Sequence, residues 1–211
     1  MKGSLIIISS PSGGGKGTLI KEVLKNVPQI GYSISYTTRE MRAGEANGRD
    51  YFFVSVAEFN RLIEKGEFLE FAEVHGNFYG TSLTQILAET NLGRDVILEI
   101  DVQGAKSVRD KIPEAVGIFI LPPSFEVLRQ RLVTRQTEKR EDLELRLKNS
   151  FDEVGHYNDF EYIVINDEVT NASKNLQAII LAERQKRIRQ TESIQVILDS
   201  FDASISNVMG E

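Results

Sequence analysis

A lysine that follows three glycines lies between a short apolar run and a stretch with helical periodicity. Residues 9–18 read SSPSGGGKGT, and the lysine is Lys16. Glycines let successive backbone N–H groups turn inward around phosphate oxygens, and a helix N-terminus adds positive potential. The segment is therefore interpreted as a phosphate-binding P-loop, and a Gly-rich turn with an incidental lysine is the alternative. The residues expected to bind ATP here are Ser12, Gly13, Gly14, Gly15, Lys16, Gly17 and Thr18.

The P-loop departs from the general G-x-x-x-x-G-K-[ST] pattern at two positions. Ser10 replaces the first glycine, and Gly17 stands where a magnesium-ligating hydroxyl usually lies. Mg²⁺ dehydrates reluctantly, so without that hydroxyl it is expected to keep more waters and to depend on nucleotide oxygens. No direct protein ligand is predicted, and Thr18, Glu99 and Asp101 are the candidates nearest to the ion.

Further motifs follow the P-loop in order. They read SYTTREMRAGE at 35–45, NGRDYFF at 47–53, EFAEVHGNFYGT at 70–81, EIDVQG at 99–104, ILPPS at 120–124 and VIND at 164–167. In these motifs the chain resembles the guanylate kinases, from residue 4 to about residue 187. The resemblance implies a three-layer α/β P-loop fold with a parallel central sheet, an inserted GMP-binding subdomain and a helical lid. It implies an enzyme of purine nucleotide metabolism that transfers the γ-phosphoryl group of ATP to GMP, and to dGMP, with Mg²⁺ as cofactor.

The implied acceptor site has residue types that suit a phosphate monoester. Arg39 and Arg42 offer planar guanidinium forks, and Tyr51 and Tyr79 offer hydroxyls. Two arginines near a turn are otherwise most often solvated surface, which is the alternative interpretation.

Glu70 is the candidate for reading the base. Guanine presents N1–H and the 2-amino group side by side as donors, so one carboxylate can accept from both, whereas adenine presents an acceptor at N1. A structural salt bridge for Glu70 is the alternative. By resemblance, Ser35 and Thr81 are hydroxyl contacts to the guanine edge and Asp101 is an acid that reaches the base. The full set implied for GMP is Ser35, Arg39, Arg42, Tyr51, Glu70, Tyr79, Thr81, Glu99 and Asp101.

The chemistry requires cations rather than a general base. A monophosphate has a second pKa near roughly 6, so the acceptor is already a nucleophilic dianion at neutral pH. Catalysis then consists of positioning and of neutralising charge on the moving phosphoryl group. The resemblance implies this role for Lys16, Arg39, Arg131, Arg135 and Arg146, and an ATP contact for Asn166. A helix surface with salt bridges is the alternative for the last three arginines, because acidic residues lie nearby.

The elements that must position these residues alternate along the chain. Short apolar runs, typical of strands covered on both faces, occur at Leu5–Ile8, Val96–Ile100, Gly117–Leu121 and Tyr162–Ile165. Helical periodicity occurs at Thr18–Leu24, Val102–Lys111, Phe125–Arg135 and Ala172–Arg187. The alternation predicts repeated βα units, and so a parallel sheet.

Two segments interrupt this pattern in what is predicted to be a single domain. Residues 33–93 have shorter, more alternating segments and are expected to form the GMP-binding subdomain with antiparallel pairing. Residues 134–152 are dense in charge and are expected to form a mobile helical lid, although Thr134 and Gln136 replace glycines common in the family. The core would consist of 1–32, 94–133 and 153–190, and 191–211 would form a helical tail that docks on the body or on another copy.

Composition narrows the class of protein. The chain has 211 residues, 41% of them hydrophobic, and no cysteine, which excludes disulfides and thiolate metal sites. No apolar run approaches the roughly 20 residues of a membrane span, so a cytoplasmic protein without a membrane partner is expected. The net charge of −6 argues against nucleic acid as a partner. A monophosphate kinase with another acceptor and a catalytically inactive phosphopeptide-binding module are the remaining alternatives.

Overall fold

A five-stranded parallel sheet forms the centre of the molecule. The computed structural model describes residues 2–74, 76–134 and 140–209, with backbone only for 140–143 and 205–209. The strands follow the order β2-β7-β1-β8-β9. They are β1 (Leu5–Ser9), β2 (Ile30–Tyr32), β7 (Asp95–Glu99), β8 (Val116–Leu121) and β9 (Tyr162–Ile165). All neighbouring pairs run parallel, so their carboxyl ends meet at one edge.

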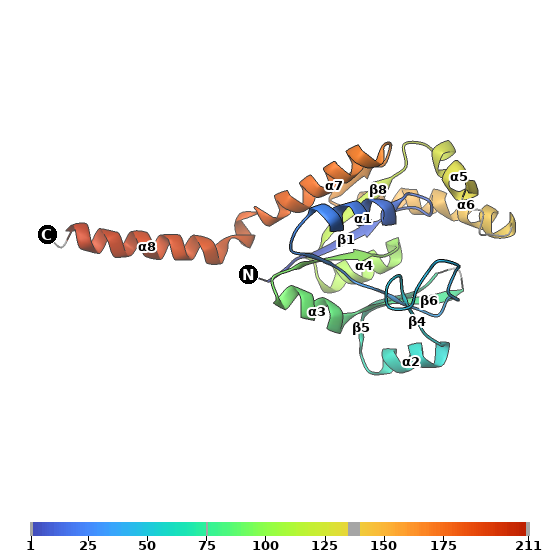
Figure 1. Ribbon diagram of the computed structural model, residues 1–211, viewed down its shortest axis with the longest axis horizontal. Coiled ribbons are helices and arrows are strands. Elements are labelled where there is room, and N and C mark those ends of the chain that lie inside the picture. The colour runs from blue at the N-terminus through green and yellow to red at the C-terminus, as the bar shows by residue number, and fades with distance from the viewer. Residues whose placement is uncertain (1, 75, 135–139, 210–211) are drawn as a thin grey trace.

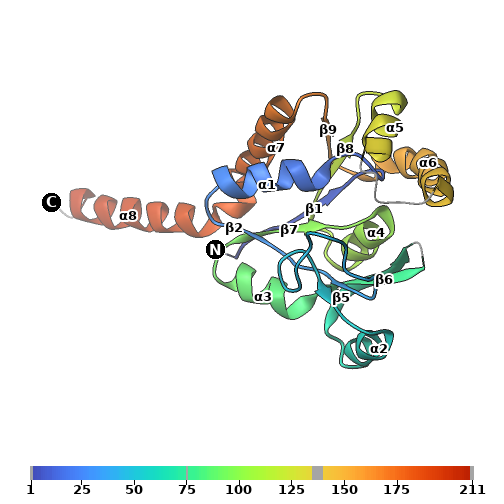
Figure 2. The same cartoon turned by 45° about the vertical axis from the view of Figure 1, so that its right-hand side comes forward.

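Helices cover both faces of this sheet, as Figures 1 and 2 show. On one face lie α1 (Lys16–Asn26) and α7 (Val169–Arg184), and on the other lie α3 (Leu83–Asn91) and α4 (Val102–Lys111). Each face has its own buried apolar cluster, because successive strand residues point to opposite sides. Ile6 and Ile8 belong to the first cluster, and Leu5 and Ile7 to the second. The expected three-layer α/β architecture is confirmed.

A smaller sheet lies within residues 33–93. Its strands, in the order β4-β3-β6-β5, are β3 (Tyr36–Thr37), β4 (Phe52–Phe53), β5 (Phe68–Val74) and β6 (Asn77–Ser82). The β5–β6 and β3–β6 pairs are antiparallel, and β3–β4 is parallel. Helix α2 (Val56–Glu64) closes this unit with Phe59, which is fully buried against the rings of Phe68 and Phe78.

Two helices stand beyond the carboxyl edge of the main sheet. They are α5 (Phe125–Thr134) and α6 (Arg140–Gly155), and α6 leads into the 3-10 turn η1 (His156–Asp159). The stacked rings of Phe125 and Phe151, with centroids 4.8 Å apart, join the two helices. The connection 135–139, which contains Arg135, is outside the described residues.

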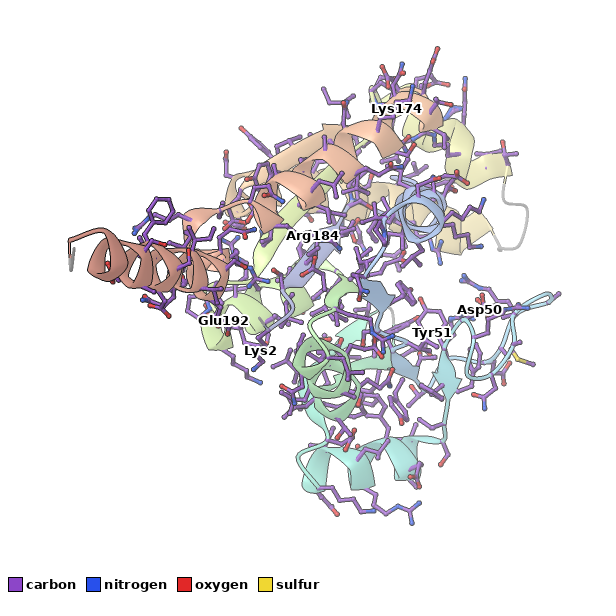
Figure 3. The ribbon with its side chains drawn as sticks, turned by 60° about the vertical axis from the view of Figure 1, so that its left-hand side comes forward. Lys2, Asp50, Tyr51, Lys174, Arg184 and Glu192 are labelled. Atoms are coloured by element: carbon purple, nitrogen blue, oxygen red, sulfur yellow. The ribbon has the colours of Figure 1, made fainter. Side chains whose placement is uncertain are left out.

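The C-terminal segment turns away from the body through η2 (Arg187–Arg189) into α8 (Thr191–Met209), which projects from the rest of the chain (Figure 1). The junction is fixed by buried Asp95, which accepts hydrogen bonds from Arg184 Nε and Ser4 N, each at 2.7 Å. Arg184 is the last residue of α7 (Figure 3), and Arg189 Nη2 also approaches Asp95, at 3.6 Å. Arg184 and Arg189 are therefore partly buried, whereas Lys186 and Arg187 between them are exposed. Among the described helices, none is long and apolar enough to cross a bilayer.

Candidate active site

The P-loop connects the carboxyl end of β1 to the first turn of α1, at the edge where parallel α/β sheets bind ligands. Gly13 and Gly15 have φ angles of 84° and 90°, a left-handed conformation that residues with a Cβ rarely adopt. The chain can therefore curl back on itself here, and Gly14 N donates to Pro11 O at 2.9 Å. This geometry belongs to a loop that surrounds an anion.

Ser10, one of the two residues that depart from the P-loop pattern, holds Lys16 inside this loop. Its Nζ donates to Ser10 Oγ at 3.1 Å and to Ser10 O at 3.4 Å. A glycine at position 10 would offer only the carbonyl. The side chain of Ser10 thus pre-positions the ammonium group and also makes a second bond, from its hydroxyl to Pro11 O.

Asn166 and Arg131 close the other side of the loop. Asn166 is buried and its Nδ2 donates to Gly14 O at 2.8 Å, while Arg131 Nη2 donates to Asn166 O at 2.9 Å. Arg131 Nη1 is buried with no hydrogen-bond partner among the described residues. An unpaired buried guanidinium nitrogen beside a P-loop is suited to an incoming anion. The cavity of about 470 Å³ at this point is lined by Gly13, Gly15, Thr18, Val127, Gln130, Arg131, Thr134, Asn166 and Val169.

A second cavity, of about 250 Å³, lies between the P-loop and the smaller sheet. It brings together Lys16, Arg146 and most of the residues expected to bind GMP. Those that line it are Ser35, Arg39, Arg42, Tyr51, Glu70, Tyr79, Glu99 and Asp101, together with Ser12 of the P-loop.

Two arginines of this cavity are organised around Glu45. Arg39 Nη2 donates to both carboxylate oxygens of Glu45, at 2.8 and 3.1 Å, and the backbone N–H of Arg42 donates to the same group at 2.8 Å. Burial opposes the charge on Glu45, but these hydrogen bonds lower its pKa overall. Glu45 therefore holds Arg39 in place as an anion, a role that the sequence did not indicate.

Two tyrosines stand beside these arginines. The Tyr51 and Tyr79 rings meet edge to face with centroids 5.9 Å apart, and the Arg39 guanidinium lies 5.3 Å from the Tyr51 ring centroid. Burial and the nearby charge of Glu99 raise the pKa of Tyr51 to about 12. Tyr51 is thus a neutral hydroxyl at physiological pH and can donate a hydrogen bond to an anion.

Glu70 is the buried acid of the cavity, with 4% of its surface exposed. Burial raises its pKa to about 7, the nearby Asp101 adds to this, and the hydrogen bond from Thr81 Oγ1 and the charge of Lys111 oppose it. The first turn of α4 lies close to the same carboxylate, because a Cβ at Gly104 would be only 2.9 Å from Glu70 Oε2. Asp101 caps that turn by accepting from Gly104 N at 2.9 Å. Thr81 therefore reaches the site through Glu70.

Glu99 lines the acceptor cavity, close to Gly17 of the P-loop. It accepts a hydrogen bond from the Tyr32 hydroxyl at 3.1 Å, and a Cβ at Gly17 would lie 3.8 and 3.9 Å from its two oxygens. The glutamate thus faces the space that a P-loop hydroxyl at position 17 would occupy. The described residues contain no group of three or more metal-ligating side chains. An oxygen-seeking cation such as Mg²⁺ fits a position beside Glu99 if nucleotide and water supply its other ligands.

The helix α6 contributes one contact that the sequence did not indicate. The Glu153 carboxylate accepts from the Ser12 backbone N–H at 2.8 Å, across 141 positions of sequence. Arg146, seven residues earlier on α6, lines the same cavity. Only the fold brings Glu153 to the P-loop, so no local signal could have identified it.

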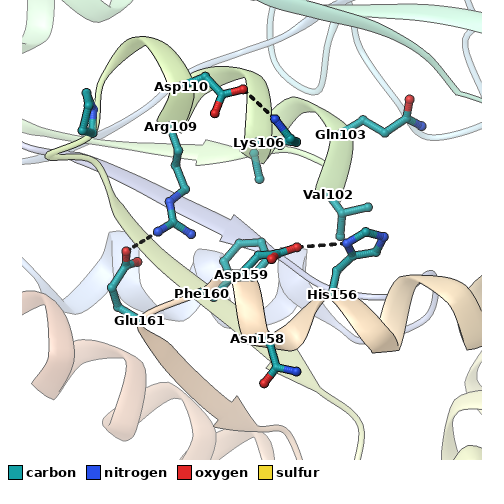
Figure 4. A pocket seen from close by; sticks show the side chains of 12 residues that line it. Val102, Gln103, Lys106, Arg109, Asp110, His156, Asn158, Asp159, Phe160 and Glu161 are labelled. Atoms are coloured by element: carbon teal, nitrogen blue, oxygen red, sulfur yellow. Dashed lines mark hydrogen bonds and ion pairs between the residues drawn. The ribbon is translucent and has the colours of Figure 1, made fainter.

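A further cavity, of about 780 Å³, lies elsewhere, between α4 and η1 (Figure 4). Its charged side chains are ion-paired with one another: Arg109 with Glu161 at 2.5 Å, Lys106 with Asp110 at 2.7 Å and His156 with Asp159 at 3.0 Å. Among the described residues that line it, each Lys and Arg side chain thus already has an acidic partner, unlike Arg131 Nη1 beside the P-loop.

A P-loop beside a second cavity lined with arginines defines a P-loop nucleotide-binding protein with room for two phosphorylated ligands. The family model described as guanylate kinase matches residues 2–183. A guanylate kinase of Neisseria meningitidis is 49% identical over 94% of this chain and 97% of its own, and one of Aromatoleum aromaticum is 47% identical over 91% and 94%. The crystal structure of guanylate kinase from Anaplasma phagocytophilum superimposes with a TM-score of 0.76 at 34% identity, covering 89% of each chain. The chain belongs to the guanylate kinase family.

Proposed function

We propose that this chain transfers the γ-phosphoryl group of ATP to GMP, and to dGMP, and so produces ADP and GDP in purine nucleotide metabolism. The observation that carries the proposal is the shared cavity in which the P-loop lysine, an arginine pair and a buried carboxylate meet. Lys16, Arg39, Arg42 and Glu70 all line it. One end can bind phosphate and the other can read a base, which is the arrangement that a nucleoside monophosphate requires.

The two ligands would occupy the two cavities on either side of Lys16. ATP would place its phosphates in the P-loop, with Asn166 and Arg131 behind them, and GMP would place its phosphate between Arg39, Arg42, Tyr51 and Tyr79. Because the acceptor phosphate is mostly a dianion at neutral pH, it needs no general base. Lys16 and the unpaired Nη1 of Arg131 would neutralise charge on the moving group.

Glu70 would select guanine over adenine. As a carboxylate it can accept from N1–H and the 2-amino group, whereas adenine would leave it facing the N1 lone pair. Ser35 and Asp101 line the same cavity and are proposed to complete the contacts to the base. Thr81 donates a hydrogen bond to this carboxylate, and Gly104 leaves room for it.

Mg²⁺ is proposed as the cofactor that accompanies ATP and shields its phosphate charge. Gly17 offers no hydroxyl ligand, so Glu99 is the acid placed to hold the waters of the ion. Thr18, which lines the ATP-side cavity, and Asp101 are the other nearby oxygen donors.

Residues 33–93 are proposed as the GMP-binding subdomain and 134–152 as the lid. Arg146 already lines the acceptor cavity, and Arg135, which lies outside the described residues, is proposed to join it when both nucleotides are bound. Closure would need both ligands, because each brings only part of the negative charge that these arginines meet.

The proposed substrates also suggest the cellular location of the chain and the classes of partner that it binds. ATP and GMP are metabolites of the cytoplasm, which we propose as its location, with no nucleic-acid or membrane partner. We further propose that copies of the chain associate through the tail at 191–211, since α8 exposes several large apolar side chains.

The decisive test compares kcat/KM for GMP, IMP and AMP at pH 8, where Glu70 is ionised. AMP lacks both donors and should react on the order of 10⁴-fold less well than GMP, with IMP in between. Glu70→Gln should lose GMP activity strongly and AMP activity slightly, whereas Arg39→Ala should weaken all three alike. Glu73→Gln, an exposed acid on the same strand, is the matched control and should change nothing. Equal losses for GMP and AMP in Glu70→Gln would refute the base-reading role, and no turnover with any monophosphate would refute the kinase.

A further inference from the structure

Tyr32 is the last residue of the edge strand β2, and its side chain reaches an acid of the neighbouring strand β7. Its hydroxyl donates to Glu99 Oε2 at 3.1 Å, across 67 positions of sequence. Parallel pairing sets Tyr32 opposite Ile97, two residues before Glu99, so the three side chains point to the same face of the sheet. That face is the one covered by α1, whose first turn contains Gly17, and β2 lies beside both β7 and α1 (Figure 2). The contact therefore joins the edge of the sheet to the start of the P-loop helix.

The donor in this contact is fixed by its surroundings. The Tyr32 ring packs against the buried apolar cluster that also contains Ile97. Burial, and then the negative charge of Glu99, raise the pKa of the Tyr32 hydroxyl well above its ordinary range. Tyr32 is therefore a neutral donor throughout the physiological pH range, and it can bind a carboxylate without neutralising it.

The acceptor is a side chain that needs such a partner. A glutamate carboxylate lies at the end of a flexible chain, and ordering that chain costs rotamer entropy. Hydrogen bonds from the described residues reach only Oε2 of Glu99. Oε1 lies 3.8 Å from the position that a Cβ of Gly17 would take, where the P-loop lacks a hydroxyl. With one oxygen held by Tyr32, the other stays directed at the first turn of α1.

We propose that Tyr32 is a positioning residue whose hydroxyl fixes the Glu99 carboxylate in the orientation that receives the waters of ATP-bound Mg²⁺. The inference rests on the magnesium-dependent reaction proposed above. A carboxylate that is already oriented loses less freedom when it accepts a hydrogen bond from a metal-bound water, so the interaction is stronger. Loss of the Tyr32 hydroxyl should therefore weaken Mg²⁺ binding, whereas the P-loop should still bind the phosphates.

The test measures how binding of a non-hydrolysable ATP analogue depends on MgCl₂, by calorimetry with the full chain and without GMP. Tyr32→Phe removes one oxygen atom and keeps the ring in the apolar cluster. Tyr162→Phe is the matched control, because the Tyr162 hydroxyl on the opposite edge strand donates to Glu183, a buried acid in the last turn of α7. Each variant loses one tyrosine–glutamate hydrogen bond, so urea unfolding should show a similar loss of stability in both.

The two variants should differ in their response to Mg²⁺. In Tyr32→Phe the Mg²⁺ concentration for half-maximal binding should rise about fivefold, and the affinity for the analogue without Mg²⁺ should stay unchanged. Tyr162→Phe should match the wild type in both quantities. In Glu99→Ala, which already requires more Mg²⁺, adding Tyr32→Phe should have no further effect. The kcat of Tyr32→Phe should fall at low Mg²⁺ and recover when Mg²⁺ is saturating.

The outcomes separate this inference from the proposals on which it rests. If Glu99→Ala raises the Mg²⁺ requirement and Tyr32→Phe leaves it unchanged or lowers it, Tyr32 does not position Glu99 and this inference alone is wrong. An equal rise in Tyr162→Phe would also overturn it, because the effect would then follow from lost stability. No effect of Glu99→Ala would refute the Mg²⁺ role of Glu99 and the inference with it. Failure to phosphorylate GMP, with these binding results intact, would refute only the kinase.

Discussion

The carboxylate of Glu153 accepts a hydrogen bond from the backbone N–H of Ser12, 2.8 Å away, and so joins the last turns of α6 to the P-loop. Glu153 lines the acceptor cavity, and Ser12 belongs to the P-loop that would bind the donor nucleotide. A change in the position of α6 is therefore transmitted directly to the loop that holds the phosphates of ATP.

Removing this contact should impair the P-loop. Glu153→Ala leaves a backbone N–H without its partner, so the free energy of unfolding should fall by about 1–2 kcal/mol and kcat/KM for ATP by roughly tenfold. Glu153→Gln keeps an oxygen that can accept and should recover most of both quantities. Urea unfolding and initial rates measure them. Asp152→Ala, an exposed neighbour on α6, is the control. Equal effects of Gln and Ala would indicate that the charge matters and the hydrogen bond does not.

Binding of GMP should release a proton near neutral pH. Glu70 has a pKa of about 7 in the free protein, and the proposed contact requires the ionised carboxylate. Below pH 7 the apparent affinity for GMP should fall by about tenfold per pH unit. Calorimetry in two buffers with different ionisation enthalpies detects the proton. The phosphate itself titrates near roughly pH 6, and Glu70→Gln keeps that contribution alone. Identical proton release from wild type and Glu70→Gln would exclude Glu70 as its source.

The same pKa predicts how stability changes with pH. The folded-state pKa of Glu70 lies above its ordinary value of 4.5, so between pH 4.5 and 7 the native state holds a proton that the unfolded state has lost. Stability therefore falls as pH rises through this window, by on the order of 2 kcal/mol. Glu70→Gln should abolish this part of the slope. Chemical unfolding at pH 5, 6 and 7 measures it.

Gly15 and Gly66 allow a matched comparison of backbone strain. Both have positive φ, 90° and 67°, but a Cβ at Gly15 would lie 2.4 Å from Asn166 Nδ2, whereas a Cβ at Gly66 would meet nothing within 4 Å. Each alanine variant should lose about 1 kcal/mol of stability to strain. Only Gly15→Ala should also displace Asn166 and lower ATP affinity, by at least tenfold. Calorimetric titration with ATP compares the two, and equal affinities would show that the Asn166 contact is dispensable.

A hydroxyl introduced at position 17 and the Glu99 carboxylate should partly substitute for each other in holding Mg²⁺. A serine at position 17 has room, because its Cβ would lie 3.8 Å from the nearest Glu99 oxygen, and it would add the missing hydroxyl. Gly17→Ser should lower the Mg²⁺ concentration needed for half-maximal ATP binding about threefold, and Glu99→Ala should raise it. The Glu99→Ala effect should be smaller in the Gly17→Ser background. Additive effects would indicate that the two positions do not act on the same ion.

The local pattern of apolar residues was sufficient to predict most strands of the main sheet and the helix α4. Tyr162–Ile165 and Val102–Lys111 have the bounds that their apolar spacing predicts, but β9 is covered on one face rather than both, since Ile163 is 40% and Ile165 55% exposed. The edge strand β2 escaped prediction, since Ile30 is the only aliphatic residue in a strand that also contains Gly31. The role of Arg184 could not be predicted for a related reason, because its partner Asp95 lies 89 positions away and only the fold brings them together.

The residues of the candidate site also fall into two groups, those that local sequence predicts and those that only the fold brings together. Lys16 and its glycines are contiguous and could be identified from spacing alone. Glu153 and Tyr32 are not part of any recognised motif, and their contacts with Ser12 and Glu99 depend on how separate segments meet. Glu45 stands in the same motif as Arg39, but its role in holding that arginine was not indicated. Sequence thus predicts groups that touch ligand better than groups that hold those groups in place.

The close approach of Gly104 to Glu70 also constrains how this chain can evolve. Gly104 lies in a helix and its backbone is ordinary, so nothing in its own turn forbids a larger residue. Its neighbour is the constraint, because a Cβ would lie 2.9 Å from Glu70 Oε2 and a methyl group would require that carboxylate to shift. The two positions are therefore expected to vary together among descendants of this sequence. A lineage that acquires alanine at 104 would have to move or shorten the acid at 70, and with it the group proposed to select the base.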